Sequence, residues 1–336
     1  MPNIKELLPK IIENQSLAQY TTFKIGGPAK YFFIAQNSDD VIKAAQAAQE
    51  TNIPFFILGG GSNLLVSDEG FDGLMIRMQN AELIIKNETI EAGAGVLLSK
   101  LVIEAANSNL SGLEWATGIP GTIGGAIRGN AGAYGHSISE SVQEVKVLDQ
   151  KLPASSAGKQ VANYKLQDCK FGYRDSIFKQ NKNSVILEVV LKLANGNQEE
   201  SRQQMRNLIT TRQGKLPHEP CAGSIFKNYE LGTMNLSADR QDYEDLKMKL
   251  PMADDDHIKK WLQFKKIPTA WFIEQCDLKG KQIGQAQISP KHANTIVNLG
   301  GAKAKDVLAL MDLIKKQVRD RFDIRLEEEI ELIGFN

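Results

Sequence analysis

The fold is decided by a buried strand that runs directly into consecutive glycines: Ile53-Pro54-Phe55-Phe56-Ile57-Leu58-Gly59-Gly60-Gly61-Ser62-Asn63-Leu64-Leu65. A second glycine-dense segment follows as Thr117-Gly118-Ile119-Pro120-Gly121-Thr122-Ile123-Gly124-Gly125-Ala126 and continues as Gly129-Asn130-Ala131-Gly132-Ala133-Tyr134-Gly135. Consecutive glycines can adopt positive φ and present successive backbone N–H groups to one anion with no side chain in the way. The simpler alternative is that each cluster marks a tight turn. Because a turn needs few glycines, two such segments favour a large phosphate-bearing ligand that lies along both.

Neither segment matches the commoner nucleotide-binding signatures. A GxGxxG motif that started at Gly59 would need a glycine where Leu64 stands, and GxxxxGK[ST] does not occur in the chain. A standard NAD-binding domain and a P-loop NTPase are therefore disfavoured.

The surrounding sequence mixes strands and helices without the regular βαβ repeat of a doubly wound fold. Apolar residues predict buried strands over 31–34 and 53–58, and Ser38-Asp39-Asp40 predicts the cap of a helix with one apolar face. Further along, the patterns predict a strand over 185–193, a helix over 304–321 and a final strand over 324–333. The expected class is α+β.

Composition and charge disfavour several kinds of protein. The 336 residues suffice for two or three domains, and 40 basic residues balance 40 acidic ones, so nothing favours a nucleic-acid or membrane-surface partner. The cysteines Cys169, Cys221 and Cys276 form no CxxC pair, and four histidines without HExxH do not indicate a metal site. Charged residues at the start and the lack of a long apolar run predict a reduced, cytoplasmic protein.

Ordered blocks along nearly the whole chain carry a resemblance to one family. They are Thr21-Thr22-Phe23-Lys24-Ile25-Gly26-Gly27-Pro28-Ala29, then 58–65, 112–135, Tyr173-Arg174-Asp175-Ser176-Ile177-Phe178, Gly223-Ser224-Ile225-Phe226-Lys227-Asn228, 270–280, Lys291-His292-Ala293-Asn294 and 326–330. Each block is a weak motif, but the ordered set resembles the UDP-N-acetylenolpyruvoylglucosamine reductase family, also called UDP-N-acetylmuramate dehydrogenase. The short interval between Arg174 and Ser224 resembles the subclass that lacks a substrate-closing tyrosine loop.

The resemblance implies a fold and a reaction. It implies FAD held by a two-lobed domain of the vanillyl-alcohol-oxidase (PCMH) type, followed by an α+β domain for the sugar nucleotide. The expected divisions are 1–78 for the first FAD lobe, 79–200 for the second and 214–322 for the substrate domain, and the C-terminal strand 323–336 can join the first lobe. NADPH would reduce FAD, which would then reduce UDP-N-acetylglucosamine enolpyruvate to UDP-N-acetylmuramate for peptidoglycan synthesis. A monomer is expected.

The resemblance also implies which residues bind the cofactor and the substrate. The FAD-binding residues would be Leu58, Gly59, Gly60, Gly61, Ser62, Asn63, Leu64, Gly118, Gly121, Thr122, Gly124, Gly125, Asn130, Gly132, Ala133 and Tyr134. The substrate-binding residues would be Lys215, Asn228, His292 and Asn294.

The chemistry requires a cation beside the substrate carboxylate and a proton donor over the neighbouring carbon, because hydride addition leaves electron density there. By matching position, Arg174 and Glu329 would take the first task and Ser224 the second. Glu329 helps only if it is protonated or bridged through a donor, since two carboxylates repel each other. Serine is a poor acid, so a relay through water or a lysine, Lys227 or Lys215, is expected. Cys221 is an alternative donor, because a thiol has a better matched pKa.

Each catalytic assignment has a structural alternative. Arg174 and Asp175 would otherwise be a turn salt bridge, Ser224 the start of a strand and Glu329 part of a solvated sheet face. At the level of the whole protein, the alternatives are a flavin enzyme of the same cofactor fold with another substrate, and a non-catalytic sugar-nucleotide binder.

The chain departs from the family pattern at two places. Glu328 stands where the family usually has proline, and the stretch 229–266 is longer and richer in charge. That stretch contains the acidic run 253–257, which lacks the spacing of a calcium loop and predicts a solvated helix start.

Overall fold

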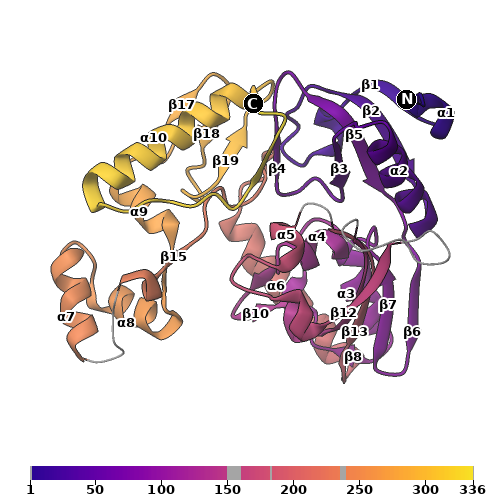
Figure 1. Cartoon of the computed structure of the whole chain (residues 1–336). Helices are drawn as coiled ribbons and strands as arrows, with labels where there is room; N and C mark the ends of the chain where they lie inside the picture. Colours follow the sequence, from indigo (N-terminus) through magenta and orange to yellow (C-terminus); the bar gives the residue numbers. More distant parts are fainter. Residues whose placement is uncertain (1, 150–159, 182–183, 235–239, 336) are drawn as a thin grey trace.

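The computed structural model describes residues 2–149, 160–181, 184–234 and 240–335, with the backbone alone for 233–234 and 240–242. Figure 1 shows two sheet-containing parts at the right and a C-terminal part, orange to yellow, that extends to the left. None of the helices in the described residues is both long and apolar enough to cross a membrane.

The first part is a sheet with strand order β1-β2-β5-β3. Its strands are β1 (Ile12–Ser16), β2 (Pro28–Ala35), β5 (Phe71–Met78) and β3 (Phe55–Leu58). β2 and β3 run parallel to β5, whereas β1 is antiparallel to β2. Both strands predicted here are confirmed, and β3 begins only after Pro54, which cannot donate to a ladder. The parallel strands aim their carboxyl ends, and with them Gly59, at one edge of the sheet.

Helix α2 (Ser38–Glu50) lies between this sheet and the next. Its cap is Asn37, not the predicted 38–40 triplet: the Asn37 side chain accepts from the backbone N–H of Asp40 at 2.8 Å. Asp39 and Asp40 instead occupy the first turn, where carboxylates interact favourably with the helix dipole. Alanines bury a face wider than one stripe, because α2 packs against both sheets in one shared core.

The second part is an antiparallel sheet with strand order β12-β11-β13-β7-β6. Its strands are β12 (Val161–Lys165), β11 (Val142–Asp149), β13 (Ser184–Lys192), β7 (Thr89–Gly93) and β6 (Leu83–Lys86). β13 confirms the strand predicted over 185–193, and its alternate residues Val185, Leu187, Val189 and Leu191 are buried. The helices α3 (Leu98–Asn107), α4 (Ile123–Arg128) and α5 (Ile177–Gln180) belong to this part.

Helix α6 (Gln198–Lys215) leads to the C-terminal part, which has a separate hydrophobic core. Its elements are β15 (Tyr229–Glu230), α7 (Arg240–Lys249), α8 (Asp255–Phe264), β16 (Lys266–Ile267), α9 (Thr269–Gln275), β17 (Gln282–Ile283), β18 (Ala286–Ile288), β19 (Ile296–Asn298) and α10 (Ala304–Phe322). The predicted helix over 304–321 is confirmed as α10. The acidic run is a helix start as predicted, because Asp254 caps α8 by accepting from the N–H of His257.

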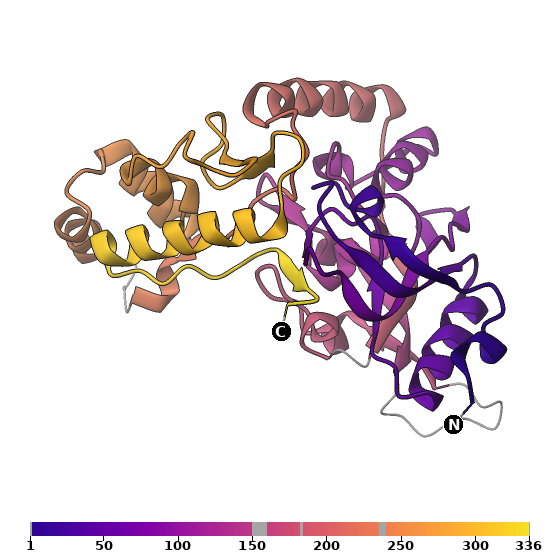
Figure 2. The ribbon, with the colours of Figure 1, turned by 90° about the horizontal axis from the view of Figure 1, so that it is seen from above.

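The end of the chain returns to the first part, as Figure 2 shows for the yellow segment after α10. The long final strand predicted over 324–333 is wrong for most of its length: β20 covers only Glu331–Ile333 and pairs in parallel with β4 (Leu64–Val66). Before β20, residues 327–329 pair with another segment, since Lys227 N donates to the Glu327 carbonyl and Glu329 N to the Ile225 carbonyl. This change of partner places Glu329 between two parts of the molecule.

Candidate active site

The two glycine segments meet backbone to backbone. A Cβ atom on Gly60 would lie 2.4 Å from the Cα of Gly121, and one on Gly59 would lie 2.6 Å from Oγ1 of Thr122. Ser62 Oγ donates to the Pro120 carbonyl at 3.1 Å. Only residues without side chains permit this approach, so the glycines are required where the two loops touch.

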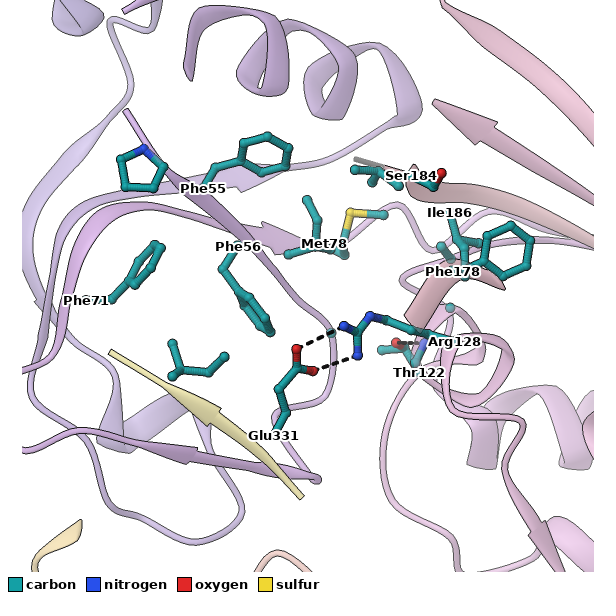
Figure 3. Close-up of a pocket in the computed structure, with 18 of the residues that line it drawn as sticks. Phe55, Phe56, Phe71, Met78, Thr122, Arg128, Phe178, Ser184, Ile186 and Glu331 are labelled. Atoms are coloured by element: carbon teal, nitrogen blue, oxygen red, sulfur yellow. Dashed lines mark hydrogen bonds and ion pairs between the residues drawn. The ribbon is translucent and has the colours of Figure 1, made fainter. Parts of the chain in front are cut away.

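A cavity of about 450 Å³ opens along both loops. A neighbouring cavity of about 390 Å³ shares Gly59, Thr122 and Gly125 with it and is walled by apolar side chains. Figure 3 shows this second cavity, with Phe55, Phe56 and Phe71 on one side and Phe178 on the other. Both volumes fall in the range of about 300–1,000 Å³ that is typical of ligand sites.

Most residues predicted to bind the cofactor line these cavities, and a few do not. The larger cavity is lined by Gly59, Gly60, Gly61, Ser62, Asn63, Leu64, Gly121, Thr122, Gly125, Gly132 and Ala133, and the neighbouring one also by Gly124. The others lie outside the lining. Leu58 is buried in a core, Gly118 packs against Arg212, and the amide of Asn130 bonds to Gly172 and Ser139. Tyr134 is exposed.

Arg174 and Glu329 form an ion pair in the wall of the larger cavity. Arg174 Nε lies 2.6 Å from Glu329 Oε1, and Arg174 Nη2 donates to the Gly132 carbonyl at 2.8 Å. The alternative turn pair with Asp175 is wrong, because the Asp175 carboxylate accepts from Ser176 N and Gln180 Nε2. Both side chains are mostly buried, at 25% and 18% exposure, so Glu329 is not on a solvated face.

Ser224 lies on a short segment, residues 223–226, that is held from two sides. On one side, Ile225 donates to the Asn294 carbonyl at 2.8 Å; on the other, its own carbonyl accepts from Glu329 N at 2.8 Å. Ile225 is fully buried in the C-terminal core, whereas its neighbour Ser224 lines the cavity. The segment therefore brings Ser224, Arg174 and Glu329 to one cavity.

The residues predicted to bind substrate do not line the cavity. Lys215 is exposed at the end of α6, and the Asn228 side chain accepts from Thr269 N at 3.2 Å. His292 is half-buried, and burial lowers its pKa. Asn294 is 2% exposed, and its amide accepts from Phe226 N and donates to the Phe226 carbonyl. Asn294 thus fixes the Ser224 segment, and its burial keeps the side chain away from a ligand in the cavity.

Four charged residues that the sequence analysis missed also line the cavity: Arg128, Lys179, Arg212 and Glu331. Arg128 and Glu331 form a two-point ion pair, with distances of 2.6 and 2.9 Å, which Figure 3 marks with dashed lines, and both residues line both cavities. A signal for Glu331 existed, since alternation puts it on the same face as Glu329. The other three carried none, because which cavity they face depends on long-range packing.

The lining is positively charged on balance. Glu329 and Glu331 form ion pairs with Arg174 and Arg128. Lys179 and Arg212 remain as further cations in the cavity lining. Arg212 Nε is buried without a hydrogen-bond partner among the described residues. Buried donors in native proteins are normally satisfied. A cavity with such groups fits a ligand with several negative charges.

Comparison with known proteins identifies the family. The model of the UDP-N-acetylenolpyruvoylglucosamine reductase C-terminal domain matches residues 215–333, and an FAD-binding domain model matches residues 29–151. The UDP-N-acetylenolpyruvoylglucosamine reductase of Solibacter usitatus is 37% identical over 320 residues, which is 95% of each chain. The chain belongs to the UDP-N-acetylenolpyruvoylglucosamine reductase family.

Two further relatives support this membership. The reductase of the same name from Bacillus subtilis is 35% identical over 330 residues, covering 97% of this chain and 95% of the relative. The crystal structure of UDP-N-acetylenolpyruvylglucosamine reductase from Thermus caldophilus superposes with a TM-score of 0.70 at 30% identity, covering 97% and 98% of the two chains. The predicted fold class, an α+β chain with a two-lobed FAD-binding domain and a C-terminal substrate domain, is confirmed.

The residues present fit an FAD. The larger cavity is bordered by side-chain-free backbone at Gly59, Gly60 and Gly121, where any Cβ would meet the facing loop. Bare amides suit a diphosphate, and the apolar walls of the neighbouring cavity suit an aromatic ring.

Proposed function

We propose that the chain is an NADPH-dependent flavoenzyme that reduces UDP-N-acetylglucosamine enolpyruvate to UDP-N-acetylmuramate in peptidoglycan precursor synthesis. The observation that carries the proposal is the convergence of Arg174, Glu329 and Ser224 on one cavity along the two glycine loops. The resemblance assigned these three positions. Ser224 and Glu329 are 105 positions apart in the chain, and Arg174 and Glu329 are 155 positions apart.

In this proposal the glycine loops hold FAD through Gly59, Gly60, Gly61, Ser62, Asn63, Gly121, Gly125, Gly132 and Ala133. When bound, FAD carries the hydride from NADPH to the enolpyruvyl double bond. Every other part of the chemistry falls to the side chains around the cavity.

Arg174 binds the carboxylate of the substrate. The Nε–H and one N–H of Nη2 are bonded to Glu329 and to the Gly132 carbonyl, which leaves both N–H groups of Nη1 and the second of Nη2 to donate to a planar carboxylate. The ion pair with Arg174 also explains why Glu329 can lie near the substrate carboxylate. The guanidinium contacts Glu329 and offsets its negative charge. Glu329 in turn fixes the orientation of the guanidinium.

Ser224 donates the proton to the carbon beside that carboxylate. Among the described residues its hydroxyl has no hydrogen-bond partner, so it is free to turn toward a substrate. Cys221 is less suitable as the donor, because it is not in the cavity lining.

The sugar nucleotide binds toward the C-terminal part. Arg212 supplies positive charge for the diphosphate within the cavity, and any contact of Lys215, Asn228 and His292 with the nucleotide lies outside the cavity lining. Asn294 acts indirectly, because its hydrogen bonds to Phe226 hold the segment that carries Ser224.

The proposal includes a division into units at 1–78, 79–200 and 214–322, a monomeric state and a cytoplasmic location. A separate core around α10 supports the third unit, whereas the core around α2 joins the first two into one packed body.

The test is an assay on the purified protein. We expect a visible flavin absorbance spectrum and NADPH oxidation that requires UDP-N-acetylglucosamine enolpyruvate. A colourless protein that cannot take up FAD would contradict a flavoenzyme. NADPH oxidation that proceeds equally with other acceptors would instead indicate a flavin enzyme with a different substrate.

A further inference from the structure

Lys179 is a half-buried lysine in the wall of the active-site cavity. It lies on α5, five residues after Arg174, and its Nζ donates to the Arg174 carbonyl at 3.2 Å. The same cavity is lined by Ser224 and Glu329. Lys179 therefore lines the same cavity as the residues assigned to the reaction.

No carboxylate among the described residues forms an ion pair with this ammonium group. The charged groups around it are Lys227, from the segment after Ser224; Arg128, on α4; Asp175, in the loop before α5; and Glu331, on β20. Asp175 is bonded to Ser176 N and Gln180 Nε2, and Glu331 holds Arg128 at two points. Burial lowers the pKa of Lys179, and the positive charges of Lys227 and Arg128 lower it further.

The two lysines expected from the sequence as a relay are less suitable. Lys215 is exposed and outside the cavity lining, and the Nζ of Lys227 forms an ion pair with Glu327 at 3.1 Å. Ser224 nevertheless requires a source of protons, because a serine hydroxyl is too weak an acid to lose its proton without prompt replacement.

We propose that Lys179 is the proton-relay residue that resupplies Ser224, an inference that rests on the function proposed above. As the hydride adds to one alkene carbon, the carbon beside the carboxylate forms its C–H bond with the Ser224 proton, and the Ser224 O–H bond breaks. The Ser224 oxygen then takes a proton from the Lys179 ammonium, directly or through one water in the cavity. The neutral amine of Lys179 regains its proton from solvent, so each turnover adds one hydride and one proton to the double bond.

This role predicts a pH dependence of defined sign. The ammonium form is the active one, so the substrate half-reaction is fast below the pKa of Lys179 and slows as the pH rises through it. Because that pKa lies below the usual 10.5 of a lysine, the decline begins at a lower pH than for an exposed lysine. An arginine at the same place stays charged and cannot deliver a proton in this range.

The experiment compares Lys179→Met and Lys179→Arg in the holoenzyme by stopped-flow measurement of each half-reaction. In both variants we expect flavin reduction by NADPH within about twofold of wild type and reoxidation by the enolpyruvyl substrate slower by about 10²–10⁴-fold. The high-pH decline should vanish in both. Lys43→Met, on the exposed side of α2, is the matched control and should match wild type.

The outcomes separate the explanations. If Lys179→Arg restores the rate, Lys179 contributes only charge, and the relay is wrong. If both half-reactions slow equally, or neither slows, it is also wrong. A wild-type protein inactive with the enolpyruvyl substrate would instead refute the proposed function.

A second measurement needs no turnover and no variant. The pH dependence with which an amine-reactive acylating reagent labels Lys179 in the substrate-free holoenzyme, read by peptide mass spectrometry, reports its pKa. We expect half-maximal reactivity at a lower pH than for the exposed Lys43. Equal pH dependence for the two lysines would overturn the proposal even if the Lys179 variants failed to fold.

Discussion

Arg174 Nε lies 2.6 Å from Glu329 Oε1, and the two residues are 155 positions apart in the chain. Arg174 reaches this position with a φ of +54°, in the left-handed region that costs a non-glycine residue about 1–2 kcal/mol. Such strain is tolerated where the surrounding contacts fix the backbone, and it concentrates at functional sites. Here the contacts are those of the guanidinium with Glu329 and with the Gly132 carbonyl.

The first prediction is that Arg174→Lys slows the substrate half-reaction. A lysine ammonium cannot reach Glu329 and the Gly132 carbonyl and still present a planar fork to a carboxylate. We expect flavin reduction by NADPH to persist while reoxidation by the enolpyruvyl substrate slows by about 10²–10³-fold. Stopped-flow absorbance separates the two steps. Arg206→Lys is the control, because Arg206 pairs with Glu199 on the exposed surface of α6. If Arg206→Lys slows reoxidation by as much as Arg174→Lys does, the effect is not specific to the active site.

The second prediction concerns the proton donor. Ser224→Ala should leave flavin reduction by NADPH nearly intact and slow the second half-reaction by orders of magnitude, because the hydroxyl that faces the cavity is removed. Cys221→Ser should change neither half, since Cys221 does not line the cavity. Rapid-mixing kinetics of both variants decide the assignment. Equal slowing of both halves in Ser224→Ala would mean that Ser224 is structural.

The local elements were predictable from sequence, but the assembly of the site was not. The alternation of apolar residues predicted β13, and their helical periodicity predicted α10. Both patterns depend only on residues close together in the sequence. The same alternation overextended the last strand, since residues 327–329 pair with 225–227 before Glu331 joins β4. That change of partner is a long-range event with no local signature.

The catalytic positions illustrate the same limit. Arg174, Ser224 and Glu329 each looked structural by local criteria, and only the family resemblance selected them. Lys179 and Arg128 were missed altogether, because a lone basic residue in a sequence does not reveal which cavity it faces. Asn294 was selected as a ligand contact, whereas its amide is used by the backbone of Phe226.

The third prediction is that Gly60→Ala weakens FAD binding. The new Cβ would lie 2.4 Å from the Cα of Gly121, so one of the two loops must move and the cavity between them must change shape. We expect a lower flavin-to-protein absorbance ratio after purification and weaker FAD binding in a fluorescence titration. Gly214→Ala is the matched control, because a Cβ there would meet no described atom within 4 Å. Unchanged FAD affinity in Gly60→Ala would show that the loop contact does not shape the cofactor site.

The fourth prediction concerns the pair Arg128–Glu331, which joins the second sheet-containing part to the returning C-terminal strand. The two side chains are 31% and 23% exposed and bonded at two points, so removing one partner leaves a mostly buried charge without its counter-ion. We expect Arg128→Met and Glu331→Met each to lower the free energy of unfolding by about 1–3 kcal/mol, measured by urea denaturation of the FAD-free protein. The double variant should lose less unfolding free energy than the sum of the two single losses. The second substitution removes the buried charge that the first one left without a partner. Strictly additive losses would indicate that the two side chains act independently and that the pair does not fasten the C-terminal strand.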